Sequence, residues 1–208
     1  MGAKYLARKV VQRIGLVGLG LQGRAHLAIL SRLYPEATSH VYHPRTAAIE
    51  DYRRAHPEQK RIIATQDAFE AAREADILVT TTTSTTPFVQ ADWVHAGMLY
   101  CQIGRDEECT VEAVSRFDRL VADDWEQTRR EGHKVLAKAH LALPQLGAVT
   151  DLGDVLSGRS PGRLTDGESI MLSCTGLSVE DIATARFMAE HAVNEDLGIR
   201  LDLSDVAL

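Results

Sequence analysis

The chain has 208 residues, which is enough for one full domain with an appendage or for two small domains. Apolar residues make up 45% of the sequence and charged residues 25%, the balance of an ordinary globular protein, and the net charge is −6. Lys and Arg are scattered, so a nucleic-acid-binding surface is not expected. A membrane helix is not expected either, because no apolar run approaches ~20 residues.

The predicted elements alternate from the N-terminus onwards between helical apolar spacing and short β-rich runs. The predicted helices of this part cover 3–9, 24–33, 46–55 and 68–74, with Thr46 as the N-cap of the third. The predicted strands cover 13–17, 39–42, 62–64, 76–82, 98–103 and 119–122. Because this alternation is typical of βαβ units, we expect a parallel sheet with helices on both faces.

The last quarter of the sequence is predicted to be less regular. Residues 151–167 are rich in Gly, Ser and Pro, which indicates a loop. A helix is predicted over 178–194, and the alternating tail over 199–203 predicts a short strand.

The three cysteines, Cys101, Cys109 and Cys174, have neither an even count nor CxxC spacing, so neither a disulfide framework nor a metal site is expected. The basic segment over 1–13 lacks the apolar centre of a signal peptide. The sequence therefore predicts a cytoplasmic protein with reduced thiols.

A glycine-rich turn follows the first predicted strand, where residues 18–23 read Gly-Leu-Gly-Leu-Gln-Gly. This GxGxxG spacing is weak alone, but here it has the required strand before it and helix after it. Gly18 permits the tight turn, Gly20 lets the backbone approach a pyrophosphate, and Gly23 lets the helix pack against the strand. The pyrophosphate binds the free N–H groups of the helix N-terminus. We therefore expect a Rossmann-type, doubly wound α/β domain that binds a nicotinamide dinucleotide, with a ligand-free glycine turn as the alternative.

The end of the second predicted strand bears on the choice of dinucleotide. In NAD-binding folds an acidic residue stands about 20 positions after the glycines and binds the ribose 2′-OH. Here that position is His43, and Arg45 stands close enough to pair with a 2′-phosphate. NADP(H) is therefore favoured over NAD(H), although Arg45 as an ordinary surface arginine remains the alternative.

Polar residues also follow two later strands, at the sheet edge where such folds bind ligands. Residues 80–86 are all Thr or Ser, which either line the cofactor pocket or form only a polar loop. The next strand ends in Gln-Ile-Gly-Arg-Asp at 102–106. Asp106 is well placed to move protons on a substrate nitrogen, with an exposed loop aspartate as the alternative.

Several motifs together resemble the ornithine cyclodeaminase/mu-crystallin family, in family order over nearly the whole chain. The matching segments are 15–24, 75–80, 84–87, 103–106, 122–127, 131–132, 152–158 and 175–181. The resemblance implies a reaction at a carbon–nitrogen bond of a small amino or imino acid, as in cyclodeaminases, ketimine and cyclic-imine reductases, some alanine dehydrogenases and opine-like synthases. Mu-crystallin itself also binds thyroid hormone.

The resemblance assigns roles to individual residues. Gln22 and Gly23 match the pyrophosphate turn, and His43 matches the ribose-discriminating position. Asp106 matches the family's proton donor and acceptor. Thr82, Cys174 and Thr175 match positions around the nicotinamide, with Thr175 on the substrate side. The full set of expected cofactor contacts is Gly18, Gly20, Leu21, Gln22, Gly23, His43, Arg45, Thr82, Ile103, Gly104 and Cys174.

Two departures from the family limit these expectations. The segment 107–110 is shorter than the family's Pro-Gly-Lys-containing stretch, so a lysine contact near the cofactor is expected to be absent. The resemblance also implies that family members begin with a substrate domain that holds the substrate carboxylate and amine and much of the dimer interface, and we expect most of this domain to be missing here. Arg105, Arg159 and Arg163 are conceivable replacements for its cationic residues.

The expected organisation is a leading helix over 1–12, an NAD(P)-binding Rossmann domain over 13–150, and a C-terminal segment over 151–208. We expect an NAD(P)-dependent enzyme whose substrate domain is truncated, supplied by a second polypeptide, or completed in a homodimer. The alternatives are a dinucleotide-binding module without catalysis and a small-ligand carrier similar to mu-crystallin. Neither nucleic acid nor a membrane is an expected partner.

Overall fold

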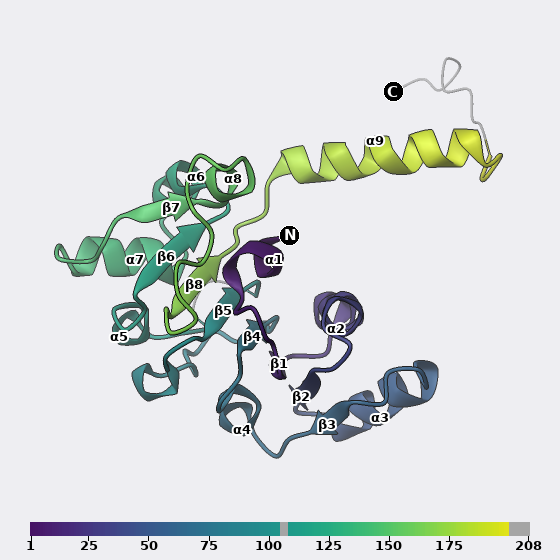
Figure 1. Ribbon diagram of the computed structural model, residues 1–208, viewed down its shortest axis with the longest axis horizontal. Helices are drawn as coiled ribbons and strands as arrows, with labels where there is room; N and C mark the ends of the chain where they lie inside the picture. Colours follow the sequence, from purple (N-terminus) through teal and green to yellow (C-terminus); the bar gives the residue numbers. More distant parts are fainter. Residues whose placement is uncertain (105–107, 200–208) are drawn as a thin grey trace. The chain divides into compact units, whose positions relative to one another are not determined.

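The computed structural model describes residues 1–104 and 108–199, which fall into two compact units. The first unit covers 1–175 and contains the whole β-sheet (Figure 1). The second begins at Gly176, and its described part is dominated by one helix, α9 (Ser178–Asn194). Within the described residues, no helix combines the length and apolar character needed to cross a membrane.

The sheet of the first unit has eight strands, and every pairing in it is parallel. Their order across the sheet is β3-β2-β1-β4-β5-β8-β6-β7. The strands are β1 (Arg13–Val17), β2 (Thr38–Tyr42), β3 (Ile62–Ala64), β4 (Ile77–Thr80), β5 (Leu99–Gln102), β6 (Arg119–Ala122), β7 (Val149–Asp151) and β8 (Ile170–Ser173). The chain reverses its direction across the sheet between β1 and β4, where doubly wound folds bind their ligands.

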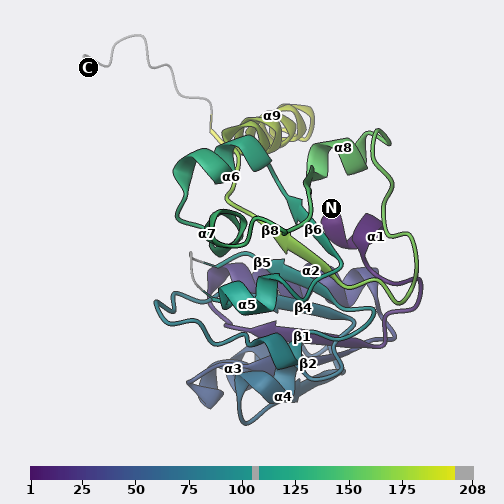
Figure 2. The same ribbon diagram turned by 90° about the vertical axis from the view of Figure 1, so that its left-hand side faces the viewer.

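Helices cover both faces of this sheet, as the sequence predicted. The helices of the first unit are α1 (Gly2–Leu6), α2 (Leu21–Leu33), α3 (Thr46–Ala55), α4 (Ala68–Ala72), α5 (Val111–Val114), α6 (Trp125–Glu131), α7 (Val135–Ala142) and α8 (Leu152–Leu156), with a short 3₁₀ turn over Ala91–Trp93. One apolar cluster joins the sheet to α1, α2, α3 and α8, and the other joins it to α4, α5 and α7. Figure 2 looks onto the second face, with α5 and α7 in front of the sheet.

The central strands are buried on both sides because their successive side chains enter opposite clusters. In β4, Ile77 and Val79 pack into the cluster with α2, while Leu78 packs into the cluster with α4. All three are at most 1% exposed. This burial explains the nearly continuous apolar run in the sequence, which is typical of parallel strands covered on both faces.

Most of the predicted elements agree with the structure. The strands 13–17, 62–64 and 119–122 and the helices 46–55 and 178–194 are confirmed to the residue. Thr46 is not an N-cap, because the helix begins at Thr46 and its N-cap is Arg45. The tail strand predicted over 199–203 lies outside the described residues except for Ile199, which is not in a strand.

The region after residue 148 differs most from the prediction. The segment 151–167, expected to be a loop, begins with the last residue of β7 and contains α8, and β8 follows it in the middle of the sheet. The Rossmann-type sheet therefore extends beyond the boundary that we expected at residue 150. Elements of three to five residues are too short to produce a clear hydrophobic period, and only pairing with β5 and β6 defines β8 as a strand.

Candidate functional site

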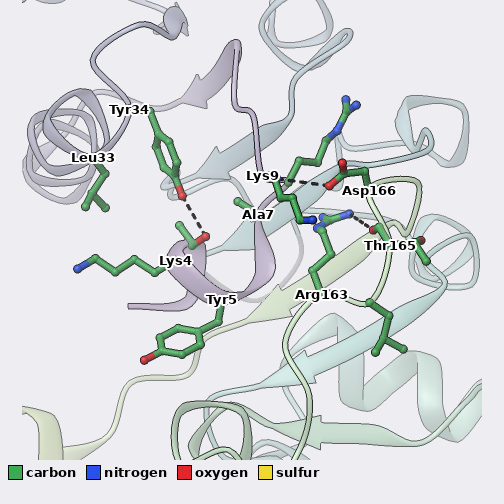
Figure 3. Close-up of a pocket in the computed structure, with 12 residues that line it drawn as sticks. Lys4, Tyr5, Ala7, Lys9, Leu33, Tyr34, Arg163, Thr165 and Asp166 are labelled. Atoms are coloured by element: carbon green, nitrogen blue, oxygen red, sulfur yellow. Dashed lines mark hydrogen bonds between the residues drawn. The ribbon is translucent and has the colours of Figure 1, made fainter.

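One large cavity lies at the wrong edge of the sheet for a dinucleotide (Figure 3). Its volume is about 710 Å³, and it is lined by residues that end α2 or precede β1 and β8, with parts of α1: Ala3, Lys4, Tyr5, Ala7, Arg8, Lys9, Leu33, Tyr34, Arg163, Leu164, Thr165 and Asp166. Its polar groups bind the chain itself, since the Tyr34 hydroxyl donates to the Ala3 carbonyl at 3.0 Å. Arg163 Nε likewise donates to the Leu6 carbonyl at 2.7 Å. Because dinucleotides bind beyond the carboxyl ends of strands, this cavity is not the candidate site.

The glycine turn has the geometry that its sequence predicts. Gly18 has a φ of +98°, a conformation that side chains disfavour, and its N–H donates to the carbonyl of Tyr42 at the end of β2. A Cβ atom on Gly23 would lie 2.0 Å from the Gly18 carbonyl oxygen, so only glycine lets α2 approach β1 this closely. A Cβ on Gly20 would meet no atom within 4 Å. The turn is thus tight at both ends and open in the middle.

The N-terminus of α2 begins at this open position. Gly20 is the N-cap, and no side chain caps the helix. The N–H groups of Leu21, Gln22 and Gly23 belong to the first turn, which has no intrahelical acceptors, and the helix dipole is positive there. The arrangement fits a pyrophosphate, because it offers uncapped donors beside a backbone that nothing covers.

Basic side chains gather beyond the end of β2, next to the glycine turn. The Arg45 N–H donates to His43 Nδ1 at 3.1 Å. Burial lowers the pKa of His43 below its usual value, and the nearby charges of Arg45 and Arg24 lower it further. The Arg24 guanidinium lies 6.0 Å from the ring centroid of Tyr52 on α3. The charges of Arg45 and Arg24 thus act on His43, at the position that the sequence linked to the ribose.

A second cavity, of about 510 Å³, opens at the carboxyl ends of the central strands. Its lining consists of Gln22, Thr81, Thr82, Thr83, Ile103, Gly104, His133, Lys134 and Thr175. These residues come from the start of α2, from the loops after β4, β5 and β8, and from the segment before α7. The structure thus brings together five predicted site residues that are far apart in the sequence: Gln22, Thr82, Ile103, Gly104 and Thr175.

A buried carboxylate lies beside this cavity. Glu108 is 0% exposed, and Oε1 accepts hydrogen bonds from the Thr82 N–H at 2.7 Å and the Thr82 hydroxyl at 2.6 Å. Its other oxygen, Oε2, accepts from the Thr80 hydroxyl at 2.6 Å. The Glu108 carbonyl holds the N–H groups of Phe88 and Val89. Burial raises the pKa of Glu108, while the hydrogen bonds from Thr80 and Thr82 and the charge of Lys134 counteract the rise.

Gly104 is enclosed between Glu108 and Lys134. A Cβ on Gly104 would lie 2.3 Å from Glu108 Oε1, and Lys134 Nζ donates to the Gly104 carbonyl at 2.9 Å. The Gly104 N–H donates to the Thr80 carbonyl at the end of β4. We name Thr80, Thr82, Gly104, Glu108 and Lys134 the Glu108 cluster. It holds the first residues after β5, the segment that leads to Asp106.

Two predicted site residues, Cys174 and Thr175, follow β8. Cys174 is half-buried, with its N–H bonded to the Gln102 carbonyl. The Thr175 N–H donates to Asp123 Oδ2 at 2.7 Å, and its hydroxyl lies 3.0 Å from that of Thr128. Asp106, the expected proton-transfer residue, lies outside the described residues, as does Arg105.

Of the arginines considered as substrate contacts, Arg159 forms an exposed ion pair with Asp154. Arg163 donates to backbone carbonyls around the first cavity. Neither lines the second cavity.

Sequence reasoning missed Glu108 and Lys134. The run Arg-Asp-Glu-Glu-Cys over 105–109 looks like a charged surface loop, and only the apolar Cys109, which bridges to Val89, indicates that the chain returns to the core there. Lys134 follows Glu-Gly-His in a polar stretch that shows no apolar period. Both side chains are buried by neighbours that are distant in the sequence.

The chain is similar to proteins of one known family. The family model described as Ornithine cyclodeaminase/mu-crystallin family matches residues 1–196. An alanine dehydrogenase of Archaeoglobus fulgidus is 31% identical over 205 residues, which are 97% of this chain and 63% of that protein. An N-((2S)-2-amino-2-carboxyethyl)-L-glutamate dehydrogenase of Staphylococcus aureus is 28% identical over 98% of this chain and 62% of the relative.

Among solved structures, an archaeal alanine dehydrogenase dimer with bound NAD is similar, with a TM-score of 0.79 and 31% identity. The match covers 97% of this chain and 63% of that one. The chain therefore spans less than two thirds of the length of these relatives.

Proposed function

The chain belongs to the ornithine cyclodeaminase/mu-crystallin family, and on this premise we propose that it is the cofactor-binding part of an NAD(P)-dependent enzyme. The reaction is the reduction or oxidation of a carbon–nitrogen bond in a small amino or imino acid, either as ketimine or cyclic-imine reduction or as a cyclodeamination. The similar dehydrogenases act, by their names, on alanine and on an N-substituted glutamate, which are amino acids of this class.

One observation carries the proposal: the uncapped N-terminus of α2 and the second cavity lie at the same carboxyl edge, and Gln22 belongs to both. The Gly18–Gly23 turn would hold the pyrophosphate on the N–H groups of α2. The nicotinamide half would then cross the ends of β4 and β5 and reach Thr82, Ile103, Gly104 and Cys174. Thr175 would lie on the substrate side of the ring.

We propose NADP(H) as the preferred dinucleotide. The charges of Arg45 and Arg24 both act on His43, and a 2′-phosphate at this position would accept hydrogen bonds from their guanidinium groups. The segment 42–46 contains no carboxylate that would repel the phosphate. The bound NAD of the similar alanine dehydrogenase supports the dinucleotide class and leaves this preference to be tested.

The chemistry divides between the cofactor and the chain. When bound, a nicotinamide cofactor supplies or accepts the hydride at the carbon of the carbon–nitrogen bond. Asp106 would transfer the proton on nitrogen, directly or through water. The Glu108 cluster would hold Gly104 and Glu108 in place at the end of β5. A substrate domain outside these residues, from a longer chain, a second polypeptide or a second copy, would orient the amino acid.

Titration of the purified chain with NADPH and NADH, followed by its mass in solution, tests the proposal. We expect a bound dinucleotide with tighter binding of NADPH. Once an imine-reducing activity is measured, Asp106→Asn should abolish turnover and leave cofactor affinity within a few-fold. Binding without turnover of any cyclic imine, even with a substrate domain supplied, would favour a module that only binds the dinucleotide, and absence of binding would refute the proposal.

A further inference from the structure

Lys134 is a buried cation in an unfavourable position. Lys134 is only 4% exposed, although it lines the second cavity. It is the N-cap residue of α7 and makes no side-chain cap there. A positive charge close to a helix N-terminus opposes the helix dipole, and burial of an ammonium group costs free energy unless the group is paired. The local structure alone therefore gives no reason for a lysine here.

The ammonium of Lys134 retains hydrogen-bonding capacity. It has three donors, and the Gly104 carbonyl, at 2.9 Å, is its only acceptor within residues 1–104 and 108–199. The negative charge of Glu108 compensates the positive charge of Lys134 at a distance. The described contacts include no ion pair between the two side chains, because Lys134 Nζ donates to the Gly104 carbonyl. Lys134 is thus balanced in charge and still able to donate hydrogen bonds into the cavity.

This combination fits a neutral oxygen acceptor better than a second anion. A carboxylate in the cavity would compete with Glu108 for one ammonium group, whereas an amide oxygen needs only a donor. The cavity also borders Gln22 at the pyrophosphate end and Thr175 after β8, so a dinucleotide anchored on α2 would bring its nicotinamide half to Gly104 and Lys134.

We propose that Lys134 binds the carboxamide oxygen of the nicotinamide ring, with Glu108 as its counter-charge. This inference rests on the proposed function, because it assumes a dinucleotide on the α2 N-terminus. It also changes the expectation drawn from the short 107–110 segment: a lysine contacts the cofactor after all, and it comes from the start of α7. The contact orients the ring by its carboxamide, which selects the ring face presented to the substrate.

The test compares two ligands that differ by the nicotinamide. NADH and ADP-ribose share the adenosine and the pyrophosphate, but ADP-ribose has no carboxamide. We expect Lys134→Met to weaken NADH binding about tenfold, the loss of one hydrogen bond from a charged donor, and to leave ADP-ribose binding within twofold. Lys138→Met, one turn further along α7, is the matched control and should change neither affinity.

The outcomes separate the two claims. If the wild-type chain binds neither ligand, the proposed function fails, and this inference fails with it. If wild type binds both and Lys134→Met binds NADH as tightly as wild type, or loses both ligands equally while folded, only the inference is overturned. Should Lys134→Met fail to fold, Lys134→Gln is measured in the same way, with at least fivefold weaker NADH binding and unchanged ADP-ribose binding expected.

Discussion

The glycine turn and the Glu108 cluster lie at the same edge of the sheet, yet they are built in different ways. The turn consists of backbone, and its shape depends on the absence of side chains at Gly18 and Gly23. The Glu108 cluster consists mainly of polar side chains, from β4 and the loop that follows it, from the segment after β5 and from the residue before α7. The first is continuous in the sequence and the second is assembled from distant segments.

This difference has a physical consequence for tolerance to change. A backbone turn fails when any atom is added at its close contacts, and it is indifferent elsewhere. A buried polar cluster fails when one member is removed, because the partners lose the hydrogen bonds that compensated their burial. Mutations can therefore break each region in its own way.

The largest effect is expected at the tightest backbone contact. Gly23→Ala places a Cβ atom 2.0 Å from the Gly18 carbonyl, so we expect the free energy of unfolding to fall by about 3 kcal/mol. Gly20→Ala, in open space, should cost no more than about 1 kcal/mol. Urea unfolding of both variants measures the contrast. Equal costs would show that the turn relaxes and that backbone contact does not define it.

Removing the buried carboxylate should cost somewhat less. Glu108→Ala leaves the hydroxyls of Thr80 and Thr82 and one N–H without their acceptor, which costs about 2 kcal/mol or more of folding free energy. The exposed Glu112→Ala on α5 is the control and should change the unfolding midpoint little. A stability of Glu108→Ala equal to that of wild type would mean that water replaces the carboxylate.

Arg45, which follows β2 beside the glycine turn, is expected to affect the choice between NADPH and NADH. Arg45→Ala should weaken NADPH binding about tenfold, through the loss of a charged hydrogen bond to the 2′-phosphate, and leave NADH binding unchanged. Arg54→Ala, an exposed arginine paired with Asp51 on the same helix, serves as the control in both titrations. A parallel loss of NADH binding would assign Arg45 to a general role in the turn.

Titration of Glu108 should have a smaller effect. Burial raises its pKa, so folding makes ionisation of this carboxyl group less favourable than in the unfolded chain. That contribution is fully present below the ordinary pKa of about 4.3 and is lost as pH rises through the higher folded value. Glu108→Gln cannot titrate, so its stability relative to wild type should improve as pH rises over this window. Unfolding at a series of pH values measures the difference, and a constant difference would argue against a raised pKa.

The smallest expected effect concerns thiol reactivity. Burial raises the pKa of Cys101 to about 12, and it also raises the pKa of the buried Cys109. Cys174 is half-buried, so iodoacetamide should modify it first. Bound NADPH should slow this reaction several-fold if Cys174 lines the nicotinamide side. An unchanged rate, measured by mass spectrometry of the labelled peptide, would remove Cys174 from the site.

The same contrast explains what could be predicted from the sequence. Gly18, Gly20 and Gly23 are adjacent in the chain and restricted by local geometry, so their spacing indicated the turn directly. Thr82, Gly104 and Thr175 were expected at the site, and the structure brings them together. Glu108 and Lys134 could not be predicted, because their burial and their hydrogen bonds arise only when β4, β5 and α7 are packed. The short strand β8 was not predicted for the same reason.

The place of β8 in the sheet also determines how the protein can assemble. β8 is the last strand of the sheet in the chain, yet it lies between β5 and β6. During synthesis, β1 to β5 can pair as one block and β6 with β7 as another, but both blocks keep an open edge until residues 170–173 leave the ribosome. Open edges invite pairing with other chains, so the nascent protein is most prone to aggregate just before this strand arrives. A stop codon upstream of residue 170 would leave the two blocks permanently unjoined.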